Sequence, residues 1–234
     1  MFFRKDYARP GPGIDPNEPE KTGFARFFQI IGLECVTLLK LNLLFLLCCI
    51  PVLTIPPALF AMHQVVRKMV LDQPVDCFYH YRTAFRRRLG RSYIAFLLTA
   101  APLAASGYGA FFYLRYAAEN YVAFLPFMVC STIFLVTMLA SPYLYGVLGA
   151  GRPVWTGLRL ALALGLGKPL RAIAADLCSY GLTLAALMPF PITVPYFIFL
   201  GFSLPCLLAN FYIRSVLRQY CPEESETKQK QGSD

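Results

Sequence analysis

The chain has 234 residues, of which 57% are hydrophobic and only 15% are charged, and its mean hydropathy is +0.52. A soluble domain usually carries about a quarter charged residues, so this composition argues against a soluble protein. A soluble all-α protein with a buried central helix is the alternative, and several long uncharged runs argue against it. The net charge of +9 does not indicate a nucleic-acid partner, because in a membrane protein the distribution of the cations matters more.

The two ends of the chain are polar and differ from the apolar middle. Residues 1–22 lack the apolar core and cleavage site of a signal peptide and are rich in proline, glycine and charge. We expect an extended cytoplasmic lead-in there, a membrane domain over 23–218, and a disordered polar tail over 219–234. Six of the eight cysteines lie in apolar segments without metal-ligand spacing, so we expect reduced thiols that act as small hydrophobes.

Four uncharged runs predict helices that cross a membrane: 41–62, 92–114, 120–151 and 177–213. A crossing takes roughly 20 apolar residues of helix. The fourth run is too long for one straight span, and the prolines between 189 and 195 provide a break.

The lysines and arginines fall into four clusters, which lie before residue 27, over 67–91, over 152–171, and after residue 213. Cytoplasmic loops collect these residues, so we expect all four clusters on the cytoplasmic side, with an even number of crossings between them. Three hairpins satisfy this condition: 29–50 with 58–71, 92–112 with 121–143, and 170–188 with 194–213.

The prediction is therefore an all-α integral membrane protein of about six hydrophobic helices in three hairpins, with both termini cytoplasmic. Five helices are full spans, and the short segment 58–71 either returns across the membrane or lies at its interface. A rival arrangement treats 41–62 as one bent span and has five crossings, but it leaves more of the lysines and arginines on the outer side of the membrane.

Two cytoplasmic segments combine cations with aromatic residues and are expected to contact lipid headgroups or a docked protein. Residues 78–91 predict a basic loop, and residues 154–167 predict a helix lying at the interface. A positive-inside anchor is one interpretation of the loop, and recognition of a protein or a phosphate is the other. The candidate contact residues are Arg82, Phe85, Arg86, Arg87, Arg88, Arg91, Trp155 and Arg159.

Four polar residues within the predicted spans are candidate functional sites, namely Glu34, Lys40, Asn42 and Asp176, with His63 more marginal. Glu34 and Lys40 are six residues apart, so they do not face each other on a helix. Asp176 is expected near the start of its helix, where the helix dipole favours an acid. For Asn42, a hydrogen bond to a neighbouring helix is one use and ligand contact the other.

The patterns of catalytic sites are missing, since no GxSxG, HExxH or P-loop sequence occurs. We therefore expect no enzyme activity, no cofactor and no metal. The glycine patterns at 107–109 and 146–149 favour close packing of helices.

The N-terminal third carries the motifs RPGPG at 9–13, FARFF at 24–28, LNLL at 41–44 and IPVLT at 50–54. With these motifs it resembles the YesL family, which comprises small multi-pass membrane proteins of Gram-positive bacteria carrying a domain of unknown function. Pro56 stands where the family turn usually has glycine, and Arg88 and Leu89 replace its usual Asn-Phe. The resemblance is good over residues 9–91 and looser to about 218.

The resemblance implies an accessory role, because members of the family are often encoded beside carbohydrate uptake systems. We expect a non-enzymatic protein of the cell membrane that assists a carbohydrate uptake (ABC-type) or envelope system, with the bilayer and a transporter permease as partners. The alternative is a small-solute transporter or channel, acting alone or as a homo-oligomer, in which Lys40, Asn42 and Asp176 line the path.

Overall fold

The computed structural model describes residues 24–71, 73, 75–87, 89–117, 121–189 and 192–220. Every regular element in this part of the chain is helical, which confirms the all-α prediction. The expected lead-in over 1–22 lies outside the described residues, as does the tail from 221, whereas 219 and 220 belong to the last helix. The elements are α1 (Phe24–Cys48), η1 (Val52–Thr54), α2 (Ile55–Val70), α3 (Cys77–Arg87), α4 (Leu89–Ala117), η2 (Tyr121–Ala123), α5 (Phe124–Gly149), α6 (Val154–Gly167), α7 (Pro169–Leu187), α8 (Val194–Phe199) and α9 (Ser203–Tyr220).

Four helical stretches are long and apolar enough to cross a membrane: Phe27–Cys48, Leu89–Ala117, Tyr121–Gly149 and Pro169–Leu187. At ~1.5 Å per residue, the 29 residues of α4 extend about 44 Å, more than the ~30 Å hydrocarbon core of a bilayer. Within the described residues, α2 and α9 do not meet the same standard of length and apolarity. Four of the six expected segments are therefore candidate membrane spans by length and composition.

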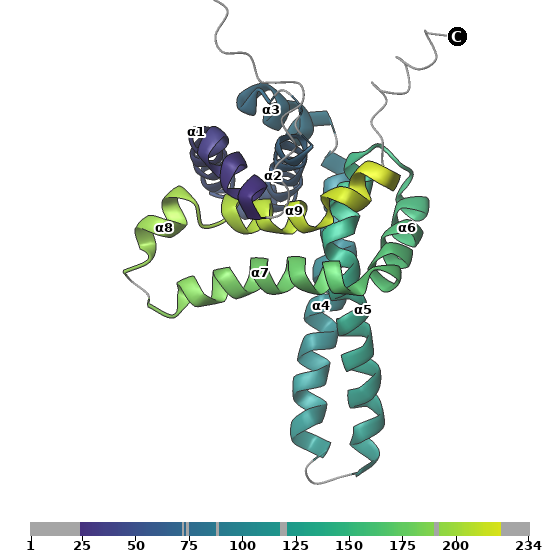
Figure 1. Ribbon diagram of the computed structural model, residues 1–234. Helices are drawn as coiled ribbons and strands as arrows, with labels where there is room; N and C mark the ends of the chain where they lie inside the picture. Colours follow the sequence, from purple (N-terminus) through teal and green to yellow (C-terminus); the bar gives the residue numbers. More distant parts are fainter. Residues whose placement is uncertain are drawn as a thin grey trace, which may run out of the picture.

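The α4–α5 hairpin extends away from the other helices (Figure 1). Large apolar side chains cover its outer half, and Tyr108, Tyr121 and Leu125 are each more than 70% exposed. The two helices approach closely at glycines: a Cβ added at Gly109 would lie 2.9 Å from the sulfur of Cys130. The expected close packing at 107–109 is thus present, and the apolar surface requires an apolar environment such as lipid.

The first expected hairpin consists of α1 and α2, which are joined by the turn 49–51 and by η1. The hydroxyl of Thr54 donates to the carbonyl oxygen of Pro51 at 2.6 Å and fixes the turn, and Pro56 lies in the first turn of α2. Two separate helices pack against each other here, so the rival prediction of one bent span over 41–62 is wrong.

The expected loop over 78–91 is also wrong, because α3 and the start of α4 occupy these residues. The carboxylate of Asp76 accepts a hydrogen bond from the backbone N–H of Tyr79 at 3.3 Å, which caps the N-terminus of α3. Cys77 and Tyr81 lie buried against the α1–α2 pair, while Arg82 and Arg86 are exposed. The segment is therefore an amphipathic helix whose apolar face packs against α1 and α2.

The third expected hairpin has a broken second arm. Instead of one helix over 194–213, the chain forms α8, a short turn, and then α9, which packs antiparallel to α7. In Figure 1, α7 and α9 run across the α4–α5 hairpin, so the three hairpins do not form a parallel bundle. The helix expected over 154–167 is present as α6 and packs on α5.

Two apolar cores meet at α9. One core joins α1, α2 and α3, and it includes Cys206 and Leu207 from the first half of α9. The other joins α4, α5, α6 and α7, and it includes Ile213 and Val216 from the second half. The space between these cores contains the candidate site.

Candidate functional site

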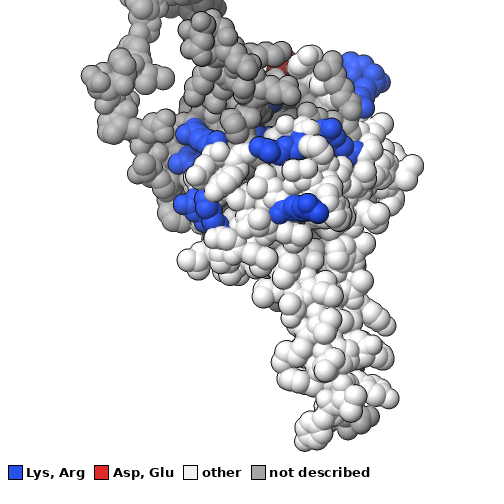
Figure 2. Space-filling view, turned by 90° about the vertical axis from the view of Figure 1, so that its right-hand side faces the viewer, with Lys and Arg blue, Asp and Glu red and all other residues white. Residues whose placement is uncertain are grey.

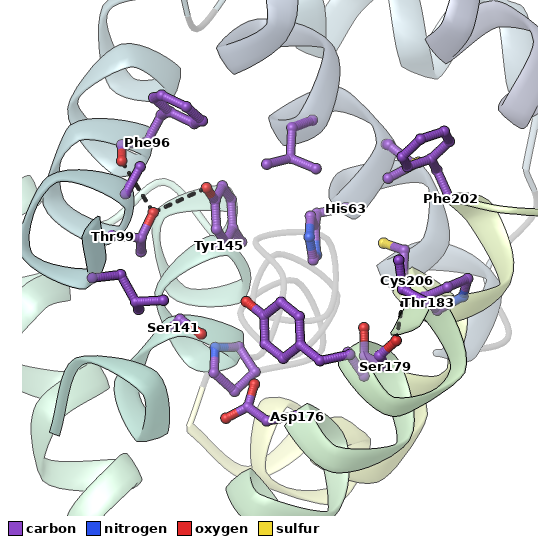
Figure 3. Close-up of a pocket in the computed structure, with 18 of the residues that line it drawn as sticks. His63, Phe96, Thr99, Ser141, Tyr145, Asp176, Ser179, Thr183, Phe202 and Cys206 are labelled. Carbon is purple, nitrogen blue, oxygen red and sulfur yellow. Dashed lines mark hydrogen bonds between the residues drawn. The ribbon is translucent and has the colours of Figure 1, made fainter. Parts of the chain in front are cut away.

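A cavity of about 540 Å³ lies between α2, α4, α5, α7 and α9. Most of its lining is apolar, and a few polar side chains reach it from four of the helices (Figure 3). These include His63 from α2, Thr99 from α4, Ser141 and Tyr145 from α5, and Asp176 from α7. A concave, mostly apolar cavity with a small number of placed polar groups is the usual form of a small-molecule site.

The α7 wall of the cavity is a polar stripe on an otherwise apolar helix. Asp176, Ser179, Tyr180 and Thr183 all line the cavity. Their spacing of i, i+3, i+4 and i+7 places them on one helix face. Of these four residues only Asp176 is among the candidates predicted from the sequence, although this periodicity is visible there and could have identified the whole stripe.

Asp176 is buried, with 5% of its surface exposed. Among the described residues, its Oδ2 atom is buried and has no hydrogen-bond partner. It lies seven residues after Pro169, beyond the first turn of α7, which contains no acid. The expected explanation from the helix dipole, which acts within the first turn, therefore does not account for Asp176.

A second polar group is built around the stacked rings of His63 and Tyr145, whose centroids are 4.6 Å apart. The amide nitrogen of Asn210 lies 3.2 Å from Nδ1 of His63 and donates a hydrogen bond to it. Because Nδ1 accepts this bond, the proton of the imidazole is on Nε2 and the ring is neutral. The hydroxyl of Tyr145 lies 3.2 Å from that of Thr99 (Figure 3), so this wall offers polar but uncharged groups.

Asn42 is fully buried but does not line the cavity. Its amide nitrogen donates to the carbonyl oxygens of Phe197 at 2.9 Å and Ile198 at 2.8 Å. Its Oδ1 accepts from the backbone N–H groups of Phe202 at 3.0 Å and Ser203 at 3.1 Å. One side chain of α1 thereby satisfies the end of α8 and the start of α9.

The other two intramembrane candidates lie elsewhere. Lys40 is exposed on α1, Glu34 is half-buried, and neither lines the cavity. Both are close enough to act electrostatically on Cys77 of α3: burial raises the pKa of the Cys77 thiol, nearby Lys40 lowers it, and Glu34 raises it. The structure therefore does not bring Lys40, Asn42 and Asp176 together as a single path.

The candidate docking residues that the structure describes lie on α3, the start of α4 and α6, and their exposed cations are here called the basic surface. Arg82, Arg86, Trp155 and Arg159 are exposed, whereas Phe85 and Arg91 are half-buried. The guanidinium of Arg159 lies 5.2 Å from the centre of the Trp155 ring, a cation–π contact. The side chain of Arg87, together with Arg88, lies outside the described part of the chain. Figure 2 shows most of the visible Lys and Arg side chains away from the tip of the α4–α5 hairpin. The exposed Arg115, in the last turn of α4, is a cation near that tip.

The part of the chain that the structure describes contains no group of three His, Cys, Asp or Glu residues able to hold a metal ion. The seven described cysteines are free thiols. The chemistry visible at the cavity is therefore that of recognition, through one carboxylate, several hydroxyls, a neutral imidazole and aromatic rings.

Comparison with known proteins gives one match. Residues 38–108 match the model of a family described as "Protein of unknown function, DUF624". This segment includes the second part of α1, all of α2 and α3, and most of α4, and it contains Asn42, His63 and Thr99. No curated protein and no solved structure matched the chain.

Proposed function

We propose that the protein binds a small solute in the cavity between its two cores and acts, without catalysis, as a solute-binding or transporting component of the cell membrane. The observation that carries this proposal is the cavity itself, which five helices form and which gathers polar groups that long apolar helices otherwise exclude. Burying such groups costs free energy, and a bound solute that hydrogen-bonds to them offsets this cost.

The broken helix supports a transport role. Gly201 and Phe202 lie in the turn between α8 and α9, and both line the cavity. In many transporters, interrupted helices line the substrate site, because their free backbone ends face the solute. We infer that the turn between α8 and α9, which Asn42 holds through four hydrogen bonds, forms the interrupted-helix wall of the site, either in a monomer or in a homo-oligomer.

The second candidate is an accessory role in a carbohydrate uptake (ABC-type) or envelope system, in which the basic surface docks on a transporter permease. The exposed Arg82, Arg86 and Arg159 favour it, since they present cations beside aromatic residues. The match to a family of unknown function over 38–108 is compatible with the resemblance to YesL. For this role we propose that the protein lies in the cell membrane of a Gram-positive bacterium and that both of its termini are cytoplasmic. The basic surface would then contact lipid headgroups.

The test is native mass spectrometry of the protein extracted gently from its own membranes, together with two matched variants. Ala100 lines the cavity from α4, so Ala100→Phe fills part of it. Ala105 lies on the same helix, is exposed and does not line the cavity, so Ala105→Phe is the control. We expect a bound small molecule in the unaltered protein and in A105F, but not in A100F.

Two results would contradict solute binding: the absence of any bound small molecule, or a molecule that A100F retains. A permease that copurifies in stoichiometric amount without a solute would instead favour the accessory role. Loss of that permease on replacing Arg82 and Arg86 by glutamine would then assign the docking surface.

A further inference from the structure

The charge of the cavity indicates what kind of solute fits it. Asp176 is the one formally charged residue among those that line the cavity, since the lining includes no lysine or arginine and His63 is neutral. The other titratable groups at the walls are Tyr145, Tyr180 and Cys206, which are uncharged at neutral pH. The cavity therefore repels anions and attracts cations.

The carboxyl group of Asp176 provides an independent reason to expect a ligand. Its Oδ2 atom is buried without a hydrogen-bond partner among the described residues, and the residue is 95% enclosed. An ionised carboxylate in such a place is strongly disfavoured unless a cation or a hydrogen-bond donor reaches it. The described residues provide no such group for Oδ2, and the free cavity beside Asp176 is the space from which a ligand can reach it (Figure 3).

We propose that the cavity binds a small organic cation, a protonated amine with an apolar body. The ammonium group would form a charge-assisted hydrogen bond with Asp176, which is short and strong in a dry environment. Phe96, Tyr145 and Phe202 offer ring surfaces for the apolar body and for cation–π contact. This assignment rests on the proposed function, because it names the class of solute that the same cavity takes.

A bare metal ion fits the site poorly. Calcium and magnesium take six or more oxygen ligands, and transition metals take several nitrogen or sulfur ligands. Within the described chain no three acidic, histidine or cysteine side chains come together, and the lining of the cavity as a whole is mostly apolar. A protonated amine needs only one carboxylate, and its carbon skeleton is suited to the apolar part of the cavity lining.

The experiment measures binding by isothermal titration calorimetry with the full chain in nanodiscs of phosphatidylcholine, a lipid without net charge. Phenethylamine, phenethyl alcohol and phenylacetate share one apolar body and differ in charge, and empty nanodiscs report partition into lipid. The variants are Asp176→Asn and, as the matched control, Asp76→Asn. Asp76 is exposed and does not line the cavity, and asparagine can replace it as the cap of α3.

We expect the amine to bind more tightly than the alcohol, and phenylacetate not to bind. D176N should weaken amine binding by roughly 10- to 100-fold and leave the alcohol unaffected, whereas D76N should change neither. D176N should also unfold thermally at the same or a higher temperature without ligand, because it removes an unpartnered charge. The comparison of the three probes on the unaltered protein does not depend on the folding of a variant.

Each contrary outcome has a separate meaning. If the alcohol binds as tightly as the amine and D176N changes neither, the cavity binds solutes but the amine assignment is wrong. If phenylacetate binds best, the sign of the charge selection is wrong. If none of the three binds in excess of empty nanodiscs, both the amine assignment and solute binding in this cavity are overturned.

Discussion

Replacement of Asn42 tests whether one buried amide holds the α8–α9 turn in place. Leucine has a similar volume but can make none of the four hydrogen bonds, so Asn42→Leu removes the bonds and keeps most of the packing. Asn42→Asp keeps an acceptor for the two N–H groups but loses both donors. Its second carboxylate oxygen would then lie against the carbonyl oxygens of Phe197 and Ile198, which the amide nitrogen now contacts at 2.9 and 2.8 Å.

The expected cost follows from the number of bonds and from burial. Hydrogen bonds between helices in membranes contribute about 0.6–1.7 kcal/mol each, and a buried backbone group left without a partner costs about 1–3 kcal/mol. Asn42 is 0% exposed, so water does not reach the four backbone groups through its position. We expect N42L to lower the free energy of unfolding by about 2–4 kcal/mol, and N42D by at least as much because of the repulsion between oxygens.

The assay is reversible unfolding in mixed detergent micelles, combined with hydrogen–deuterium exchange of the protein in nanodiscs. N42L should lose exchange protection at the amides of Phe202 and Ser203, whereas protection in α4 and α5 stays. Thr132→Val is the control, because the hydroxyl of Thr132 is exposed and bonds only within its own helix, to the carbonyl of Met128. Unchanged protection at 202–203 in N42L, with unfolding as in T132V, would refute the reasoning.

Two further predictions follow from local contacts. A Cβ at Gly165 would lie 2.7 Å from the carbonyl oxygen of Leu139, so Gly165→Ala should destabilise the α5–α6 contact by about 1–3 kcal/mol. Gly167→Ala has nothing within 4 Å and should be neutral or stabilising by up to about 1 kcal/mol in the same unfolding assay; equal effects of the two would contradict the close contact. Burial raises the pKa of the Cys77 thiol and nearby Lys40 lowers it, so alkylation of Cys77 by iodoacetamide should be slow at neutral pH and slower still in Lys40→Met, as measured by peptide mass spectrometry. Faster alkylation in K40M would contradict this assignment of the charges.

The helices were predictable where the sequence carries a strong and local signal. The uncharged runs predicted α4 and α5, because few charges are tolerated over the length of a span. The runs together with the distribution of the cations predicted α1 and α7. The helix α3 was missed because its arginines and aromatic residues resemble a basic loop, and only the cap by Asp76 and the spacing of Cys77 and Tyr81 indicate a helix. The break between α8 and α9 was missed because the prolines at 189 and 191 predicted the turn there, and a single helix was expected after it.

The site was less predictable than the helices, for a physical reason. The polar stripe of α7 is a property of one helix and could be recognised from spacing alone. The cavity needs five helices to pack at a particular depth, and Asn42 meets its partners on α8 and α9 more than 150 residues away. Such contacts are set by the packing of the whole chain, and neither composition nor periodicity specifies them.

The matched segment contains part of the scaffold of the cavity but not the acidic residue that lines it. Residues 38–108 contain Asn42, which holds the α8–α9 turn, and the walls that carry His63 and Thr99. Asp176 lies outside this segment, on α7. If Asp176 selects the solute, similarity over 38–108 implies a related scaffold without implying the same solute.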